Sequence, residues 1–268
     1  MTTRLDTELV RRGLARSRRH AGELIAAGRV LVDGQPARRS ATSVTPELGV
    51  TVAATDEPEY ASRAGHKLAG ALEALPALAV SGRACLDAGA STGGFTDVLL
   101  RRGAASVCAV DVGHDQLVER LRLDPRVEVR EGVNVRTLAA GDVLPAPSLV
   151  VADLSFISLP LVLPALAAVA ADDADLLVMV KPQFEVGRER LGSGGVVRDV
   201  GLRADAVVGV ARAAAELGLA VRGVVTSPLA GPSGNVEYFL WLTPRPSPEV
   251  PAERIASVVR GEAPGGEL

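Results

Sequence analysis

The stretch LDAGASTGGFT, residues 86–96, decides the fold of most of this chain. It opens on the end of an apolar run, crosses a loop of small residues with three glycines, and continues into a segment typical of a helix. A strand that turns through such a loop into a helix is the opening unit of a doubly wound α/β sheet, where ligands bind beyond the carboxyl ends of the strands. The stretch therefore predicts an α/β domain with a ligand site at this loop.

The segments around the loop alternate between strand and helix. Helices are predicted near residues 94–103, 160–171 and 201–218. Buried strands are predicted in RACLDAG, ASVCAVDVG, VEVREG, SLVVADLS and DLLVMVKPQ, with a closing hairpin at the sheet edge in VRGVVTS and VEYFLWL. This alternation predicts a parallel, doubly wound sheet. The Pro-rich tail is expected to hold a short helix and is assigned no chemistry.

The first part of the chain predicts a separate, small α+β unit. LDTELVRRGL indicates a helix, and Ser17 is the expected N-cap of a second helix, RRHAGELIAA, which Gly28 ends. RVLVDGQPA then predicts a strand that turns at Asp33–Gly34. Residues 1–40 hold nine arginines against four acidic residues, although the whole chain has a net charge of −3. A local basic patch of this kind favours nucleic acid as a partner.

The expected domain boundaries follow from these segments. We expect a small N-terminal domain over residues 1–55, a linker over 56–62, a large domain over 63–245 and a C-terminal tail over 246–268. The linker prediction rests on ATDEPEYAS, which is polar and contains a proline.

Composition excludes several classes of protein. The 268 residues are 47% hydrophobic, yet no apolar run reaches the roughly 18 residues that span a bilayer. The N-terminus lacks the apolar core of a secretory signal, so a cytoplasmic location is expected. Cys85 and Cys108 stand in apolar, strand-like runs and are expected to be buried thiols. With three histidines and no zinc-like spacing, no metal site is expected.

Three ligand sites compete for the glycine loop. Gly89-Ala-Ser-Thr-Gly93 fits the nucleophile elbow of hydrolases, but no histidine follows His114, so the required chain order is missing. A dinucleotide site requires a glycine where Ser91 stands. Asp111 follows the next predicted strand at the spacing of a ribose-binding acid, which suits nicotinamide and adenosyl cofactors alike.

S-adenosylmethionine fits the loop best. The pattern D-x-G-x-x-x-G-G starts with Asp87, an acid that we expect to face the cationic amino acid end of this cofactor through a water molecule. Small residues let the backbone approach the ligand, and no pyrophosphate has to be accommodated. A tight turn without any ligand is the plain structural alternative.

Lysine is unusually rare in this chain. Of 29 basic residues, 27 are arginine, and only Lys67 and Lys181 are lysine. Lys181 ends one predicted buried strand, Asp153 ends another, and Glu237 enters the last strand. Arginine stays protonated in proteins, whereas a lysine can lose its proton when it is desolvated. Two lysines beside one ligand site therefore suggest chemistry that a guanidinium group cannot perform, such as deprotonation of a hydroxyl group.

Together these segments resemble a known family. SRAGHKL, LDAGASTGGFT, VVADLSFISL, VKPQFEVG and GPSGNVEYFLWL look like the TlyA family, once called hemolysins, with an FtsJ-type methyltransferase domain. The resemblance spans nearly the whole chain. Its N-terminal hairpin after a basic helix pair is similar to the αL RNA-binding module of ribosomal proteins, pseudouridine synthases and tyrosyl-tRNA synthetases. The implied fold is a Rossmann-like methyltransferase sheet with a small N-terminal α+β RNA-binding domain.

The resemblance also implies an activity and a set of residues. Family members are S-adenosylmethionine-dependent enzymes that methylate the ribose 2′-oxygen of cytidine in ribosomal RNA, and the longer type acts on both ribosomal subunits. The implied catalytic residues are Lys67, Asp153, Lys181 and Glu237. The implied cofactor-binding residues are Asp87, Gly89, Ser91, Gly93, Gly94, Phe95, Asp111 and Asp153. The expected RNA-binding residues are Arg11, Arg12, Arg16, Arg18 and Arg19.

Some points stay open at this stage. Burial lowers the pKa of a lysine and neighbouring carboxylates raise it, so Lys181 could act as a base or as a charged hydrogen-bond donor. Residues 58–61, Pro-Glu-Tyr-Ala, depart from the Arg-Trp-containing linker of some family members, which leaves a linker role in cofactor binding open. A noncatalytic ribosome-assembly factor and a pore-forming hemolysin are the alternative functions. The target nucleotides and the oligomeric state are not predicted.

Overall fold

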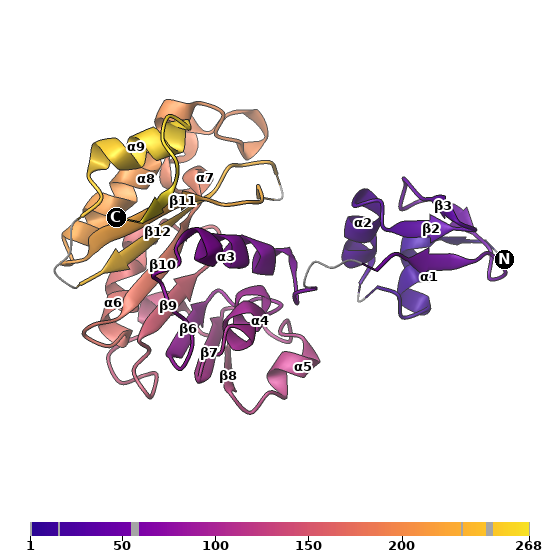
Figure 1. Cartoon of the computed structure of the whole chain (residues 1–268), viewed down its shortest axis with the longest axis horizontal. Helices are drawn as coiled ribbons and strands as arrows, with labels where there is room; N and C mark the ends of the chain where they lie inside the picture. The colour runs from indigo at the N-terminus through magenta and orange to yellow at the C-terminus, as the bar shows by residue number, and fades with distance from the viewer. Residues whose placement is uncertain (1, 16, 55–58, 232, 245–248, 268) are drawn as a thin grey trace. The chain divides into compact units, whose positions relative to one another are not determined.

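The computed structural model divides the chain into two compact units, Met1–Glu59 and Tyr60–Leu268 (Figure 1). It describes residues 2–15, 17–54, 59–231, 233–244 and 249–267, and it does not describe the side chains of Arg19, Arg188 and Ser193. Residues 56–58 of the expected linker, residues 245–248 at the expected start of the tail, and Arg16 thus lie outside the described residues.

The first unit packs two helices against short strands. Its helices are α1 (Leu5–Arg11) and α2 (Arg18–Ala26). Its strands are β1 (Thr3–Arg4), β2 (Val30–Val32), β3 (Gln35–Pro36), β4 (Ser43–Val44) and β5 (Val50–Val52). The Ser17 hydroxyl accepts a hydrogen bond from the His20 backbone N–H at 3.1 Å, so the expected N-cap is confirmed. The predicted turn is confirmed as well, because β2 and β3 pair across Asp33 and Gly34, whose φ values are both positive.

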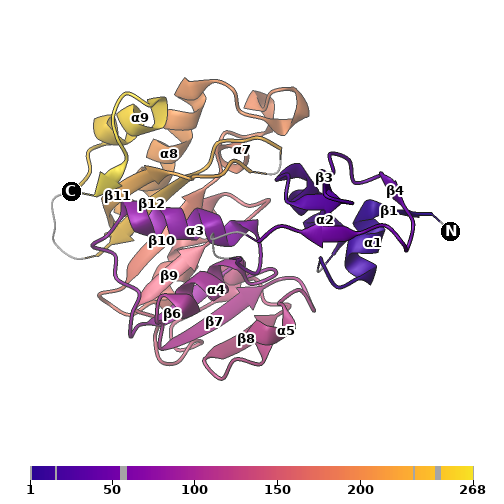
Figure 2. The same cartoon turned by 45° about the vertical axis from the view of Figure 1, so that its right-hand side comes forward.

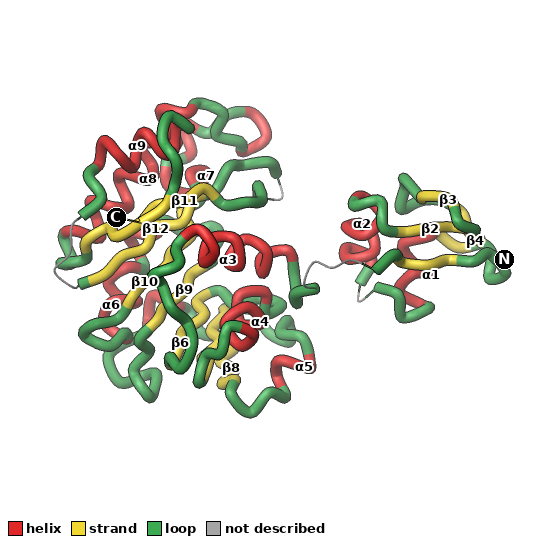
Figure 3. Tube along the Cα trace, viewed as in Figure 1, coloured by secondary structure: helices red, strands yellow, loops and turns green. Residues whose placement is uncertain are grey.

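The second unit is built on an eight-stranded sheet in the order β13-β11-β12-β10-β9-β6-β7-β8 (Figure 3). The strands are β6 (Ala84–Ala88), β7 (Ser106–Asp111), β8 (Val127–Glu131), β9 (Leu149–Ala152), β10 (Asp175–Val180), β11 (Ala220–Thr226), β12 (Tyr238–Thr243) and β13 (Gly266–Glu267). The five strands from β10 to β8 in this order are parallel, and β11 to β13 run antiparallel to their neighbours. The doubly wound prediction is therefore confirmed for the strands that carry the loop.

Helices cover both faces of the sheet (Figure 2). One face packs against α6 (Leu163–Val169), α8 (Val200–Ala215) and α9 (Ala252–Arg260). The other packs against α3 (Arg63–Ala74), α4 (Gly94–Arg101) and α5 (Glu119–Arg122). A short helix, α7 (Pro182–Glu185), follows β10 directly. Burial on both faces explains why β6, β7, β9 and β10 are largely apolar. The edge strand β8 alternates and is only partly buried, so the expectation of a buried strand is corrected there.

The end of the chain is a structural part of the second unit. α9 packs against α8, and β13 pairs with β11, so this unit's edge strand comes from the segment that the sequence marks only as a tail. The hairpin of β11 and β12 does not form the edge that the sequence suggests, because β13 adds outside β11. A two-residue strand has no periodic pattern that could have predicted it. Among the described residues, no helix is long and apolar enough to cross a bilayer.

Candidate active site

The four residues that the resemblance marks as catalytic come together near one end of the sheet, where β9 and β10 finish. Asp153 directly follows β9 and Lys181 directly follows β10, and these two strands are parallel neighbours. β12 runs antiparallel to β10, so Glu237, which precedes β12, starts from the same end. Lys67 lies in the first half of α3, which covers one face of the sheet. The structure joins these residues into two lysine–carboxylate pairs.

Lys67 and Glu237 form the more buried pair. Lys67 Nζ donates a hydrogen bond to Glu237 Oε2 at 2.5 Å, and both side chains are buried. A Cβ atom at Gly231 would lie 2.5 Å from Glu237 Oε1, so the backbone at Gly231 lies directly against this carboxylate. Removing one member of such a pair leaves an uncompensated buried charge, which costs about 3–5 kcal/mol. The pair therefore ties α3 to the start of β12.

Lys181 is held between a carboxylate and a hydroxyl group. Its Nζ atom lies 2.6 Å from Asp153 Oδ1 and donates a hydrogen bond to Ser155 Oγ at 2.8 Å. The approach to Oδ1 is an ion contact that lacks the alignment of a hydrogen bond. Lys181 is buried, whereas Ser155 is exposed. The ammonium group of Lys181 thus contacts a solvent-accessible position, which the hydroxyl group of a substrate can reach. Ser155 was not singled out from the sequence.

Glu185 links the segment after β10 to the loop after β9. Its carboxylate accepts hydrogen bonds from Ser158 Oγ at 2.6 Å and from the Leu159 backbone N–H at 2.9 Å. Burial raises the pKa of Glu185, and the two hydrogen bonds oppose that rise. The sequence offers one weak signal for this role, since Glu185 stands four residues after Lys181, but spacing alone does not reveal that the side chain turns back to the neighbouring loop.

The glycine loop between β6 and α4 is tightly curled. Gly89, Ser91 and Gly93 all have positive φ angles, of 87°, 46° and 94°. A Cβ atom at Gly89 would lie 2.7 Å from the backbone oxygen of Asp153, so the loop lies directly against the end of β9 that carries this residue. Only glycine satisfies both the positive φ and this close approach. The loop and the Asp153–Lys181 pair are therefore built against each other.

Asp87 lies fully buried at the start of this loop. Its Oδ2 atom accepts a hydrogen bond from Thr96 Oγ1 at 2.7 Å, whereas Oδ1 has no hydrogen-bond partner among the described residues. Burial raises the pKa of Asp87 to about 7, more than the hydrogen bonds from Thr96 lower it. A buried carboxylate with one unpartnered oxygen fits a cationic ligand group, bound directly or through water. This observation agrees with the amino group of S-adenosylmethionine.

Asp111 at the end of β7 holds two loops in place. Its carboxylate accepts hydrogen bonds from the backbone N–H groups of Ser91 at 2.9 Å and Gly113 at 2.7 Å. The Ser91 hydroxyl lies 3.0 Å from the side-chain oxygen of Gln116, in the loop after β7. Each carboxylate oxygen keeps a further acceptor site, so Asp111 can still accept from a ribose hydroxyl group. Gln116 carries no motif that could have identified it from the sequence.

The structure gives the remaining loop residues an internal packing role. A Cβ atom at Gly93 would lie 2.3 Å from Leu121, and one at Gly94 would lie 2.3 Å from Ser62 Oγ. The Phe95 ring is buried in the core and stacks on Phe239 at 6.1 Å between centroids. The Phe95 side chain thus packs in the core, and cofactor binding by Phe95 stays a prediction.

An aromatic pair, of which one ring is exposed, follows the ends of β9 and β10. Phe156 follows Ser155, has a φ angle of 64° and is 91% exposed. Its ring lies 5.2 Å from that of Phe184, which belongs to α7 just after Lys181. A large apolar side chain held in a left-handed conformation and left in water suggests a binding role more than a packing role.

The N-terminal arginines are organised by two buried carboxylates. Arg11 and Arg12 bind Glu8, and Arg18 binds Asp6. Arg12 also donates to the backbone oxygens of Leu48, Thr45 and Pro46, so it fastens α1 to the segment before β5. Arg11 and Arg18 remain largely exposed and free to contact a phosphate. The other two expected RNA-binding side chains, those of Arg16 and Arg19, lie outside the described side chains.

Comparisons with known proteins agree with this geometry. Residues 60–243 match the FtsJ-like methyltransferase family, and residues 3–50 match the S4 domain. The chain is 60% identical over 239 residues to the 16S/23S rRNA (cytidine-2′-O)-methyltransferase TlyA of Mycobacterium tuberculosis, with 89% of each chain covered. It is 36% identical to Hemolysin A of Brachyspira hyodysenteriae, with 88% of this chain and 98% of that protein covered. A solved structure described as a hemolysin of Streptococcus thermophilus matches with a TM-score of 0.77 at 37% identity, covering 97% of this chain and 95% of that one.

The fold and the site thus define an S-adenosylmethionine-dependent methyltransferase of the FtsJ-like class that carries an N-terminal S4 domain. Within that class, the chain belongs to the TlyA family, some of whose members carry hemolysin names.

Proposed function

We propose that this protein methylates the ribose 2′-oxygen of cytidine in ribosomal RNA, in both ribosomal subunits, using S-adenosylmethionine. The observation that carries the proposal is the two lysine–carboxylate contacts, Lys67–Glu237 and Lys181–Asp153, at the end of the sheet that also bears the glycine loop. The relative from M. tuberculosis that is 60% identical is named for this activity. An enzyme that acts on ribosomes is expected in the cytoplasm.

The cofactor is proposed to bind along the glycine loop. Asp87 would face its amino acid end, the backbone from Gly89 to Gly93 would approach it closely, and Asp111 would hold its ribose. The unpartnered Oδ1 atom of Asp87 supports this assignment, because a cationic amino group would supply the missing hydrogen bond. When it is bound, S-adenosylmethionine supplies an electrophilic sulfonium methyl group.

Lys181 is proposed to handle the proton of the attacked hydroxyl group. Its Nζ atom already donates to the Ser155 hydroxyl at 2.8 Å, so an acceptor hydroxyl can occupy the same environment. Asp153 holds the lysine head in place at 2.6 Å and balances its charge. Lys67 and Glu237 form a buried pair whose opposite charges cancel. In this proposal the pair fixes α3 and keeps water away from the neighbouring strand ends. Holding the reacting groups in place in this way can supply much of the rate enhancement by itself.

The exposed Phe156 ring supports a nucleic acid as the substrate. Bases of single-stranded or looped RNA stack on aromatic side chains, and such stacking is worth about 1–3 kcal/mol per base. Because Phe156 follows Ser155, which touches Lys181, a base stacked there would bring its own ribose toward the lysine. The S4 domain would supply sequence-independent phosphate contacts through Arg11 and Arg18.

The test is to map 2′-O-methylation in ribosomal RNA of cells with and without this protein, together with calorimetry of S-adenosylmethionine binding. We expect at least one cytidine in each subunit to lose its methyl group when the protein is absent. Asp111→Ala should weaken cofactor binding by about 1.5–3 kcal/mol, the scale of a hydrogen bond to a charged group. Unchanged methylation in both subunits, or no cofactor binding by the unmodified protein, would contradict the proposal.

A further inference from the structure

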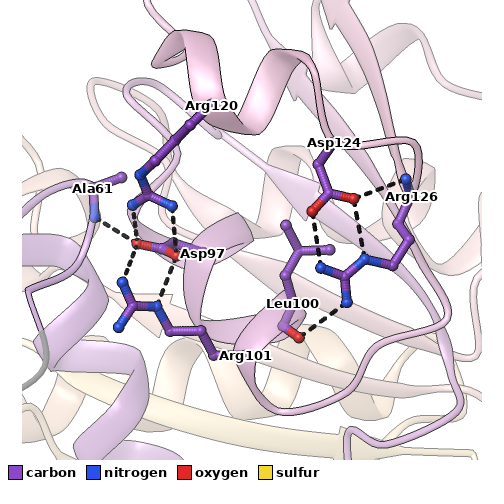
Figure 4. A network of polar contacts seen from close by, with 7 residues as sticks. All are labelled: Ala61, Asp97, Leu100, Arg101, Arg120, Asp124 and Arg126. Carbon is purple, nitrogen blue, oxygen red and sulfur yellow. Dashed lines mark hydrogen bonds and ion pairs between the residues drawn. The ribbon is translucent and has the colours of Figure 1, made fainter.

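Asp97 is a buried carboxylate that belongs to neither the lysine pairs nor the glycine loop. It lies in the first turn of α4, three residues after the loop ends at Gly94, and its side chain is 3% exposed. Figure 4 shows that its two oxygens accept hydrogen bonds from three directions. The donors come from α4 itself, from α5, and from the backbone at the start of the second unit. Asp97 therefore joins three segments around one helix start.

The first of these segments is α5. Arg120 donates to both Asp97 oxygens, at 3.0 Å and 2.5 Å, in the two-pronged geometry that makes such pairs strong and directional. On the same stretch of chain, Leu117 and Leu121 press against Gly93, where a Cβ atom would lie 2.8 Å and 2.3 Å from their side chains. The Arg120–Asp97 contact thus holds two leucines against the last turn of the glycine loop.

The second segment runs from Tyr60 into α3. The Ala61 backbone N–H donates to Asp97 Oδ2 at 2.8 Å. The next residue, Ser62, presses against Gly94, where a Cβ atom would lie 2.3 Å from its Oγ atom and 2.9 Å from the backbone nitrogen of Gly65. Asp97 thereby fixes the segment that packs on the second glycine of the pair.

The third donor, Arg101, strengthens the second segment. It binds Asp97 across one turn of α4 at 2.9 Å, and its guanidinium group lies 5.1 Å from the centroid of the Tyr60 ring. Burial raises the pKa of Asp97, but the hydrogen bonds from Arg120 and Arg101 more than offset this, so the pKa stays below its usual value. Asp97 is consequently ionised at neutral pH, and both guanidinium groups are drawn to it.

We propose that Asp97 is a positioning residue for the cofactor, acting through Gly93 and Gly94. The inference rests on the proposed cofactor site at the glycine loop. Gly93 and Gly94 have no side chains, so the loop takes its shape from whatever presses on it, namely Leu117 and Leu121 on one side and Ser62 on the other. The segment with the two leucines and the segment with Ser62 are both hydrogen-bonded to the Asp97 carboxylate. Without its charge, α5 and the 60–65 segment lose their common anchor, and the loop is free to open.

The test is Asp97→Asn, which keeps the size of the side chain and an acceptor for Ala61 but removes the charge that holds the arginines. We expect S-adenosylmethionine to bind about tenfold more weakly by calorimetry, the scale on which removal of a supporting residue weakens other ligand sites. Arg120→Gln should give a weakening of the same direction, and its half-exposed side chain makes a folding defect less of a concern.

Asp124→Asn is the matched control. Asp124 forms a comparable two-pronged pair with Arg126 near the same helix, also drawn in Figure 4, but this pair closes the turn before β8. Loss of the Asp124 charge should lower thermal stability without changing cofactor affinity. If Asp97→Asn and Arg120→Gln bind the cofactor as tightly as Asp124→Asn does, the positioning role is wrong. If the unmodified protein does not bind the cofactor, the proposed function fails instead, so the two failures are distinguishable.

Discussion

Helix α1 of the first unit and the candidate active site of the second unit both hold cations against carboxylates, but the cations differ. In the first unit, Asp6 and Glu8 hold arginines whose side chains are up to 61% exposed. In the second unit, Asp153 and Glu237 hold Lys181 and Lys67, whose side chains are at most 9% exposed. The carboxylate orients the cation in both cases. What differs is whether the cation reaches into solvent or is withheld from it.

Under the proposed function, this difference separates phosphate binding from proton transfer. An exposed guanidinium group stays charged and presents a fork that matches phosphate oxygens. A shielded ammonium group is a compact donor that can exchange a proton with a hydroxyl group beside it. The carboxylates keep either cation in one place, which limits the entropy that is lost when a partner binds. The following predictions test whether methyl transfer depends on the shielded lysines and RNA affinity on the exposed arginines.

The largest effect is expected for Lys181→Arg. The charge stays, but a guanidinium group is larger and cannot accept a proton, so methyl transfer should fall by about 10²–10⁴-fold, the range associated with lost acid–base catalysis. Single-turnover methyl transfer to ribosomal subunits is the measurement. Turnover within a few-fold of the unmodified enzyme would show that Lys181 acts only through its charge.

Removal of residues 1–59 should have the next largest effect. The remaining unit keeps its sheet, the glycine loop and the Ala61–Asp97 contact, so it should fold and bind S-adenosylmethionine like the full chain. Methyl transfer to ribosomal subunits should fall by more than about tenfold, because the phosphate contacts that supply much of nucleic acid affinity are gone. Calorimetry and methyl transfer with the same preparation separate the two effects. If the truncated protein methylates subunits as well as the full chain does, the S4 domain has no role in substrate binding.

A smaller and more specific effect is expected for Arg11 and Arg18. Changing both to alanine should reduce the slope of log affinity for RNA against log salt by roughly 1.5 units, since each lost phosphate contact removes somewhat less than one released counterion. Changing both to lysine should leave the slope unchanged, because the charges remain. Arg12→Ala is a contrasting variant for the two exposed arginines. It should lower the stability of the N-terminal unit, because the hydrogen bonds to the backbone oxygens of Leu48 and Pro46 are lost. Equal slopes for the alanine and unmodified proteins would contradict the phosphate role.

The smallest effect concerns Asp87 and pH. Its pKa is about 7 in the folded protein and close to 4 in an unfolded chain, so ionisation opposes folding. The unfolded state releases this proton first, and stability from this group therefore falls as the pH rises from about 4 to about 7. Asp87→Asn cannot ionise, so it should raise the melting temperature of the cofactor-free protein more at pH 8 than at pH 5. A gain of the same size at both pH values would show that Asp87 is not neutral when buried.

The sequence predicted the larger elements, and the four residues that it marks as catalytic form two lysine–carboxylate pairs in the structure. Strands β6, β7, β9 and β10 were predictable because strands buried on both faces form largely apolar runs between turn residues, whereas β8 alternates and is only partly buried. The Ser17 cap was predictable because a helix N-cap depends on local hydrogen bonding only. Lys67 and Lys181 stood out because lysine is so rare in this chain, and the family resemblance supplied their partners.

Other features were decided only by the tertiary structure. The place of β12 between β10 and β11, the edge strand β13 and the packing of α9 all depend on pairing between distant segments, which no local pattern encodes. Asp97, Ser155 and Glu185 look like ordinary polar residues in the sequence. Their roles appear only once folding has surrounded each with donors, because the energy of a buried polar group depends on its neighbours in space and not on its neighbours along the chain.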